Sequence, residues 1–132
     1  MADIVTKART NYFSVNNIPK FLQMMEEWDK KYNIRLLKRQ NSDGNPLYAF
    51  TYDESDLNEN LVDLQEFLPE SEAVILQQVG YEESINGSLR YVFGTAMIVT
   101  SNAIDSIDLS TLALQRVRKL LIKPDYKTIL DY

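Results

Sequence analysis

The stretch AVILQQVGYEESINGSLRYVFGTAMIVT, residues 73–100, decides the fold. Two runs rich in β-branched and aromatic residues, 73–79 and 89–100, flank a polar segment that contains Asn86-Gly87. Asn-Gly favours the tight turn whose twist matches a pair of antiparallel strands. We therefore predict a β-hairpin, with residues 89–100 as a central strand. Gly94 within that strand indicates a bulge or the close approach of another backbone.

A strand and a long helix are predicted at the start of the chain. Residues 7–15 are rich in aromatic and β-branched side chains and predict the first strand. Asn16-Asn17 then offers an N-cap, Pro19 suits a first helical turn, and Asn33 offers a stop. Between these signals the apolar residues recur at the spacing of one helix face: Ile18, Phe21, Leu22, Met25, Trp28 and Tyr32.

A second hairpin and a short helix are predicted before residue 73. Residues 34–40 and 47–53 predict two strands, joined by turn-forming residues at 41–46. The acidic segment that follows has leucines at helical spacing, which predicts a short helix at residues 58–67 that Pro69 ends.

The C-terminal part of the chain predicts an edge strand at residues 103–108 and then a last helix. Ser110 offers its N-cap, basic residues occupy its C-terminal half, and Pro124 ends it. We expect the tail, residues 125–132, to dock on the body of the protein. The order β-α-β-β-α-β-β-(β)-α predicts a single α+β domain over residues 1–132. Its sheet is mostly antiparallel, with the helices packed on one face.

Composition excludes most kinds of catalytic and metal site. The 132 residues include no His and no Cys, so Ser-His-Asp, Cys-His and zinc sites with nitrogen or sulfur ligands cannot form. The four glycines match no phosphate-binding loop. Asp56-x-Asn58-x-Asn60 begins like a calcium loop, but Leu61 and Phe67 occupy the positions that require Gly and Glu. We expect no enzyme, no cofactor and no metal; an enzyme that uses carboxylates or Tyr remains an alternative.

Charge and hydropathy narrow the choice of partners and compartment. The net charge is −5, which argues against direct binding to nucleic acid, because phosphate contacts need clustered Lys and Arg. No apolar run is long enough for a signal peptide or a membrane span. We expect a cytoplasmic protein that binds neither membrane nor nucleic acid.

The acidic residues are concentrated in the middle of the chain. Residues 40–89 contain eleven Asp and Glu and no Lys or Arg. The candidate partner-binding residues are Asp53, Glu54, Asp56, Glu59, Asp63, Glu66, Glu70 and Glu72. Such a face would dock on a basic protein surface, such as the nucleic-acid-binding groove of a host protein. The alternative is a solvated face that only keeps the protein soluble.

Two other groups of residues have both a structural and a functional interpretation. Tyr48, Phe50 and Tyr52, with Tyr91 and Phe93, would form a base-stacking platform or, as we favour, pack in the core under a helix. Arg9 and Asn11 lie two apart in the first strand, where they would bind a ligand carboxylate or, as we favour, serve a structural role.

Two motif regions carry a family resemblance. The sequence ARTNYFSV at residues 8–15, followed by the amphipathic helix, resembles a group of small proteins found on bacterial plasmids, integrative elements and phages. Residues 73–100, with the pattern R-Y-x-x-G-x-A at residues 90–96, also resemble that group. The group has no assigned activity, so the resemblance supplies no catalytic residue.

The resemblance implies a non-catalytic inhibitor of a nucleic-acid-targeting host defence system, of the anti-restriction or anti-CRISPR type. A phage-encoded protein of this kind would act in the host cytoplasm. A binding module with a housekeeping or immunity role, which uses the aromatic sheet face, is the alternative.

Overall fold

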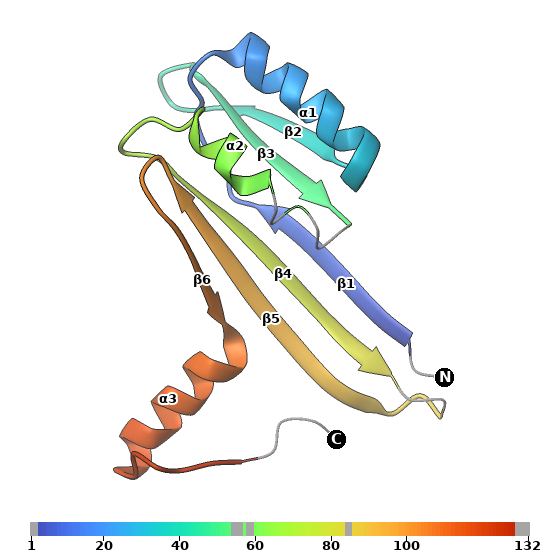
Figure 1. Cartoon of the computed structure of the whole chain (residues 1–132), viewed down its shortest axis with the longest axis vertical. Helices are drawn as coiled ribbons and strands as arrows, with labels where there is room; N and C mark the ends of the chain where they lie inside the picture. Colours follow the sequence, from blue (N-terminus) through green and yellow to red (C-terminus); the bar gives the residue numbers. More distant parts are fainter. Residues whose placement is uncertain (1–2, 54–56, 58–59, 84–85, 129–132) are drawn as a thin grey trace.

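The computed structural model describes residues 3–53, 57, 60–83 and 86–128. Its elements, in order, are β1 (Asp3–Thr10), α1 (Ile18–Tyr32), β2 (Arg35–Gln40), β3 (Pro46–Tyr52), α2 (Leu61–Gln65), β4 (Ala73–Glu83), β5 (Leu89–Thr100), β6 (Ile104–Asp108) and α3 (Leu109–Leu121). All six strands form one antiparallel sheet in the order β2-β3-β1-β4-β5-β6 (Figure 1). The predicted α+β class and the predicted order of elements are confirmed.

Helix α1 forms where its end signals and its apolar stripe agree. The Asn17 side chain accepts a hydrogen bond from Lys20 N at 3.4 Å, and Pro19 occupies the first turn. Every third or fourth residue is buried against the sheet: Phe21, Met25, Trp28 and Tyr32. Asn33 ends the helix in the left-handed region, with φ of 53°, a conformation that Asn tolerates better than most residues.

The core lies between one face of the sheet and the two helices α1 and α2 (Figure 1). Phe13, Phe21 and Phe50 are fully buried and pack edge to face, with ring centroids 5.9 and 6.3 Å from Phe13. Trp28 packs against Phe50 in the same manner at 6.2 Å. The predicted packing of Tyr48, Phe50 and Tyr52 under a helix is confirmed, because all three are buried there.

Strand β1 ends earlier than predicted, at Thr10, since Asn11 replaces regular pairing with side-chain hydrogen bonds. The Asn11 amide donates to Ala73 O at 3.0 Å and accepts from Ile75 N at 2.7 Å. Phe13 then pairs with Tyr48 as an isolated bridge. The structural role that we favoured for Asn11 is the one it has.

The hairpin of β4 and β5 is the longest pairing in the sheet, and its lower part extends beyond α1 and α2 (Figure 1). Gly87 in its turn has φ of 84°. The register shift lies between Glu82 and Glu83, not at Gly94. At Gly94 it is a side chain, and not another backbone, that comes close. A Cβ placed on Gly94 would lie 3.4 Å from the Cβ of Leu109.

Helix α3 is capped by Asp108 and not, as predicted, by Ser110. The Asp108 carboxylate accepts hydrogen bonds from Thr111 N at 2.7 Å and Thr111 Oγ1 at 2.8 Å. Asp108 is also the last residue of β6, so the strand runs into the helix without a linker and the cap falls two residues earlier. The tail returns to α3, where Arg118 Nε donates to Tyr126 O at 3.0 Å; residues 129–132 lie outside the described residues.

Helix α2 spans the five residues Leu61–Gln65, where residues 58–67 were predicted; it ends two residues earlier than predicted, and residues 58 and 59 lie outside the described residues. Of the helices that the structure describes, none is long and apolar enough to cross a membrane.

Candidate protein-binding surface

The acidic segment is fixed to the core by its leucines. Leu57, Leu61, Leu64 and Leu68 are all buried, with exposed fractions of 4% or less. Fully burying a Leu side chain contributes about 1.5–3 kcal/mol, so four of them hold the segment firmly against the sheet. The spacing of the leucines therefore marks the buried side of the segment, as predicted, while Asp63 and Glu66 between them are exposed.

Three of the predicted partner-binding carboxylates lie on the outer side of this segment. Asp63, Glu66 and Glu70 are exposed, and we call them the α2 acidic surface. Within the part of the chain that the structure describes, no hydrogen bond or ion pair engages these carboxylates. Val62, the residue before Asp63, is 62% exposed and adds an apolar side chain to the exposed side of α2.

Glu72 differs from these three because its carboxylate bonds to the chain itself. Oε2 accepts from Ser14 N and from Ser14 Oγ, both at 2.8 Å, and Oε1 accepts from Ala73 N at 3.1 Å. These bonds tie the start of β4 to the segment that leads into α1. Glu72 is therefore engaged in holding the fold together.

Asp53 lies at the end of β3, beside the end of α1. Its carboxylate accepts from Asn33 Nδ2 at 2.6 Å, and its N–H donates to Tyr32 O at 3.3 Å. Glu54, Asp56 and Glu59, which were also predicted to bind a partner, lie outside the described residues.

The aromatic residues of β3 belong to the core and offer no stacking platform. Burial raises the pKa of Tyr52 to about 12, because the phenolate would lose its hydration there. Phe93 on β5 is half-buried, and the side chain of Tyr91 lies outside the described residues. Asn60, the last position of the calcium-like motif, donates a hydrogen bond to the Tyr32 hydroxyl. Over the described residues, no cluster of acidic side chains could hold a metal ion.

Two features of the surface were not predicted. The first is a depression of about 550 Å³ where β3 ends beside β1, with Lys7, Arg9, Thr51 and Gln77 among its lining residues. Residues Arg9, Thr51 and Gln77 are register partners, so they form one row across the sheet. Only the strand pairing brings them together, so no local pattern in the sequence indicates this row.

The second is a large exposed apolar area on α3 and the neighbouring strands. No residue of α3 is buried, although the helix carries seven Leu, Val or Ala residues. The sequence predicted that all the helices pack on one face of the sheet. For α3 this prediction is wrong, because Leu109 lies beside Gly94 and Val79 on the face opposite α1 and α2.

Comparison of the chain with protein-family models, with curated proteins and with solved structures gave no match. Function is therefore argued from the geometry of these surfaces.

Proposed function

We propose that this protein is a non-enzymatic inhibitor that binds another protein through the α2 acidic surface, Asp63, Glu66 and Glu70. The target carries a basic groove that normally holds nucleic acid, as in restriction and CRISPR effector proteins. One observation carries the proposal: three exposed carboxylates, which have no hydrogen-bond or ion-pair partner among the described residues, stand on a segment that four buried leucines fix in place.

The rigid backbone of this segment matters for binding. Exposed charges contribute little binding free energy when the groups that carry them must first be ordered. Here the backbone that carries the carboxylates is already fixed by Leu61 and Leu64. A fixed negative patch raises the association rate with a positive groove and selects among partners. The excess of acidic residues over the whole chain, net charge −5, acts in the same direction.

The decisive experiment removes the charges of the α2 acidic surface and keeps the size and shape of its side chains. The triple variant Asp63→Asn, Glu66→Gln, Glu70→Gln is compared with a matched variant of α1, Glu26→Gln, Glu27→Gln, Asp29→Asn, which loses the same three charges from exposed positions. DNA cleavage by purified restriction endonucleases and CRISPR effector complexes is measured with each protein added. We expect the wild type and the α1 variant to inhibit, and the α2 variant to inhibit about tenfold less, at roughly 0.2–1 kcal/mol per exposed pair.

Salt provides the second test. Raising the ionic strength shortens the Debye length from about 10 Å at 0.1 M to about 3 Å at 1 M, which should weaken inhibition by the wild type. Equal inhibition by the α1 and α2 variants, with no dependence on salt, would reject the α2 acidic surface as the contact. That result would favour a binding module that uses another face.

A further inference from the structure

Helix α3 lacks the cover that an amphipathic helix requires. It has thirteen residues, none of them buried, and Leu120 and Leu121 are 75% and 50% exposed. Isolated helices shorter than about 12–15 residues are marginal in water, and most helical stability in proteins comes from packing of the apolar face. Within the monomer, α3 packs mainly through its first turn, where Leu109 lies against Gly94. The rest of its apolar face therefore needs a partner.

The adjoining part of the sheet is uncovered on the same side. Val79 and Gly94 are register partners, and the Cβ position of Gly94 touches Leu109, so α3 begins on the sheet face opposite α1 and α2. Val92 on β5 and Ile107 on β6 fall on that face by strand alternation and are 55% and 42% exposed. The distal apolar surface is the name we give to Val79, Val92, Ile107, Leu109, Leu112 and Leu120.

We infer that a second copy of this chain covers the distal apolar surface, in a two-fold dimer whose α3 helices pack antiparallel. A two-fold axis brings the same patch of both chains together, so one contact covers both exposed helices and both uncovered sheet faces. A closed pair leaves no copy of the surface exposed for further assembly.

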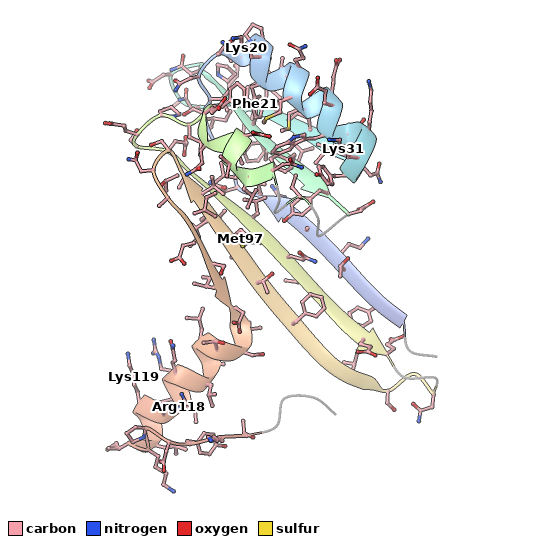
Figure 2. The ribbon with its side chains drawn as sticks, viewed as in Figure 1. Lys20, Phe21, Lys31, Met97, Arg118 and Lys119 are labelled. Carbon is pink, nitrogen blue, oxygen red and sulfur yellow. The ribbon has the colours of Figure 1, made fainter. Side chains whose placement is uncertain are left out.

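The charges along α3 favour this antiparallel arrangement. Residues 109–124 contain no Asp or Glu, while Arg116, Arg118 and Lys119 occupy the C-terminal half of the helix. Figure 2 shows Arg118 and Lys119 on α3 at the far end of the molecule from Phe21 in the core. Asp105 and Asp108 precede the helix. Antiparallel packing sets the basic half of each helix beside the acidic start of the other, and it aligns the two helix dipoles favourably.

The area that a stable dimer needs explains why the strands take part as well. Thirteen helical residues span about 20 Å, and packed helices lie about 8–10 Å apart, so contact between the two helices alone covers roughly 200 Å² of each chain. A standard interface covers about 800 Å² per partner. Val79, Val92 and Ile107 extend the apolar surface from the helix across the sheet toward that size.

The test is the oligomeric state of the full chain at micromolar concentration, measured by sedimentation equilibrium and by light scattering. We expect a dimer. The double variant Leu112→Glu, Leu120→Glu should be monomeric at the same concentration, with a dissociation constant at least about a hundredfold higher. The matched control Val62→Glu changes an apolar residue of similar exposure on α2 and should remain dimeric.

A charge exchange tests the antiparallel orientation. Lys123 is an exposed basic residue just after the end of α3, and Asp105 is an exposed acidic residue before its start. Asp105→Lys and Lys123→Glu should each weaken the dimer about tenfold, and the two together should restore it. A wild type that stays monomeric, or a double Glu variant that still dimerises, would overturn the inference. So would α3-dependent binding of the monomeric wild type to phosphatidylcholine–phosphatidylglycerol vesicles, since α3 would then be a membrane-surface helix. The α2 triple variant should lose inhibition and keep the dimer, so failure of one proposal is distinguishable from failure of the other.

Discussion

Helices α1 and α3 have nearly the same design and opposite surroundings. Both begin at a side-chain cap, Asn17 in one and Asp108 in the other, and both carry basic residues in the last turn. Both end at a residue in the left-handed region, Asn33 or Ile122. Yet α1 buries four side chains against the sheet and α3 buries none. An amphipathic pattern thus defines a face to be covered, and it does not say what covers it.

The two ends of the sheet show the same contrast between buried and exposed apolar side chains. Around α1 and α2, the core is filled by aromatic rings from α1, β3 and the segment after β1, together with the leucines of α2. Around α3, the strands extend beyond α1 and α2 and carry exposed Val and Ile side chains. The chain therefore buries its apolar side chains at one end of the sheet and leaves apolar side chains exposed at the other.

The largest expected effect compares one apolar residue from each helix. Phe21→Ala on α1 should lower the free energy of unfolding by about 3–5 kcal/mol, because Phe21 is fully buried among Phe13, Tyr48 and Phe67. Leu120→Ala on α3 should change it by less than about 0.5 kcal/mol in dilute, monomeric protein. Urea unfolding of both variants checks this; similar losses would mean that α3 is already covered within the monomer.

A smaller difference in the free energy of unfolding is expected between substitutions of two carboxylates in the acidic segment. Glu72→Ala should cost about 1.5–3 kcal/mol, since it removes a charged acceptor from Ser14 N and Ser14 Oγ. Glu70→Ala should leave stability unchanged within about 0.5 kcal/mol, because that side chain is exposed. The midpoints of urea unfolding measure both. Equal effects would show that Glu72 is no more structural than its neighbour.

A substitution at the end of α3 is expected to stabilise the protein. Ile122 has φ of 55°, where a β-branched side chain costs roughly 1–2 kcal/mol, whereas Asn33 at the end of α1 accepts the same conformation. Ile122→Gly should therefore gain about 1 kcal/mol, and Asn33→Gly should gain less. Thermal unfolding in the monomeric Leu112→Glu, Leu120→Glu background keeps dimerisation out of the comparison. If Ile122→Gly lowered the stability, the proposed backbone strain at Ile122 would be rejected.

Much of the fold could be predicted because local signals agreed with one another. The bounds of α1 follow from Asn17, Pro19, the apolar stripe and Asn33, and the Asn86-Gly87 turn sets the hairpin of β4 and β5. The cap of α3 was wrong because Asp108 and Ser110 are both good capping residues. Only the pairing of Asp108 with Thr95 at the end of β6 decides between them.

The candidate surface was harder to predict because it depends on contacts between distant parts of the chain. Leucine spacing correctly separated the buried side of the acidic segment from its exposed side. The partner of Glu72 is Ser14, 58 positions away, and no local pattern indicates that contact. The exposure of α3 was missed for a related reason: its face is as apolar as a docked helix requires, and only the placement of β6 leaves it uncovered.

The smallest expected effect is local and distinguishes the two caps by pH. Hydrogen bonds from Thr111 N and Thr111 Oγ1 lower the pKa of Asp108 below its ordinary value of 3.8. A lowered pKa in the folded state means that the cap stabilises α3 fully above about pH 4 and that this contribution is lost as the pH falls through the lowered pKa. Asn17, the cap of α1, carries no titrating group.

Acid should therefore loosen the start of α3 before it affects the start of α1. NMR spectra recorded between neutral pH and pH 2 would follow the amide of Thr111, which should titrate with a midpoint below 3.8, while the amide of Lys20 stays unchanged. Asp108→Asn keeps an acceptor at the cap and should abolish the titration at Thr111. If both amides titrate together in the wild type, the acid response belongs to the whole domain, and the two helices are more tightly coupled than their packing indicates.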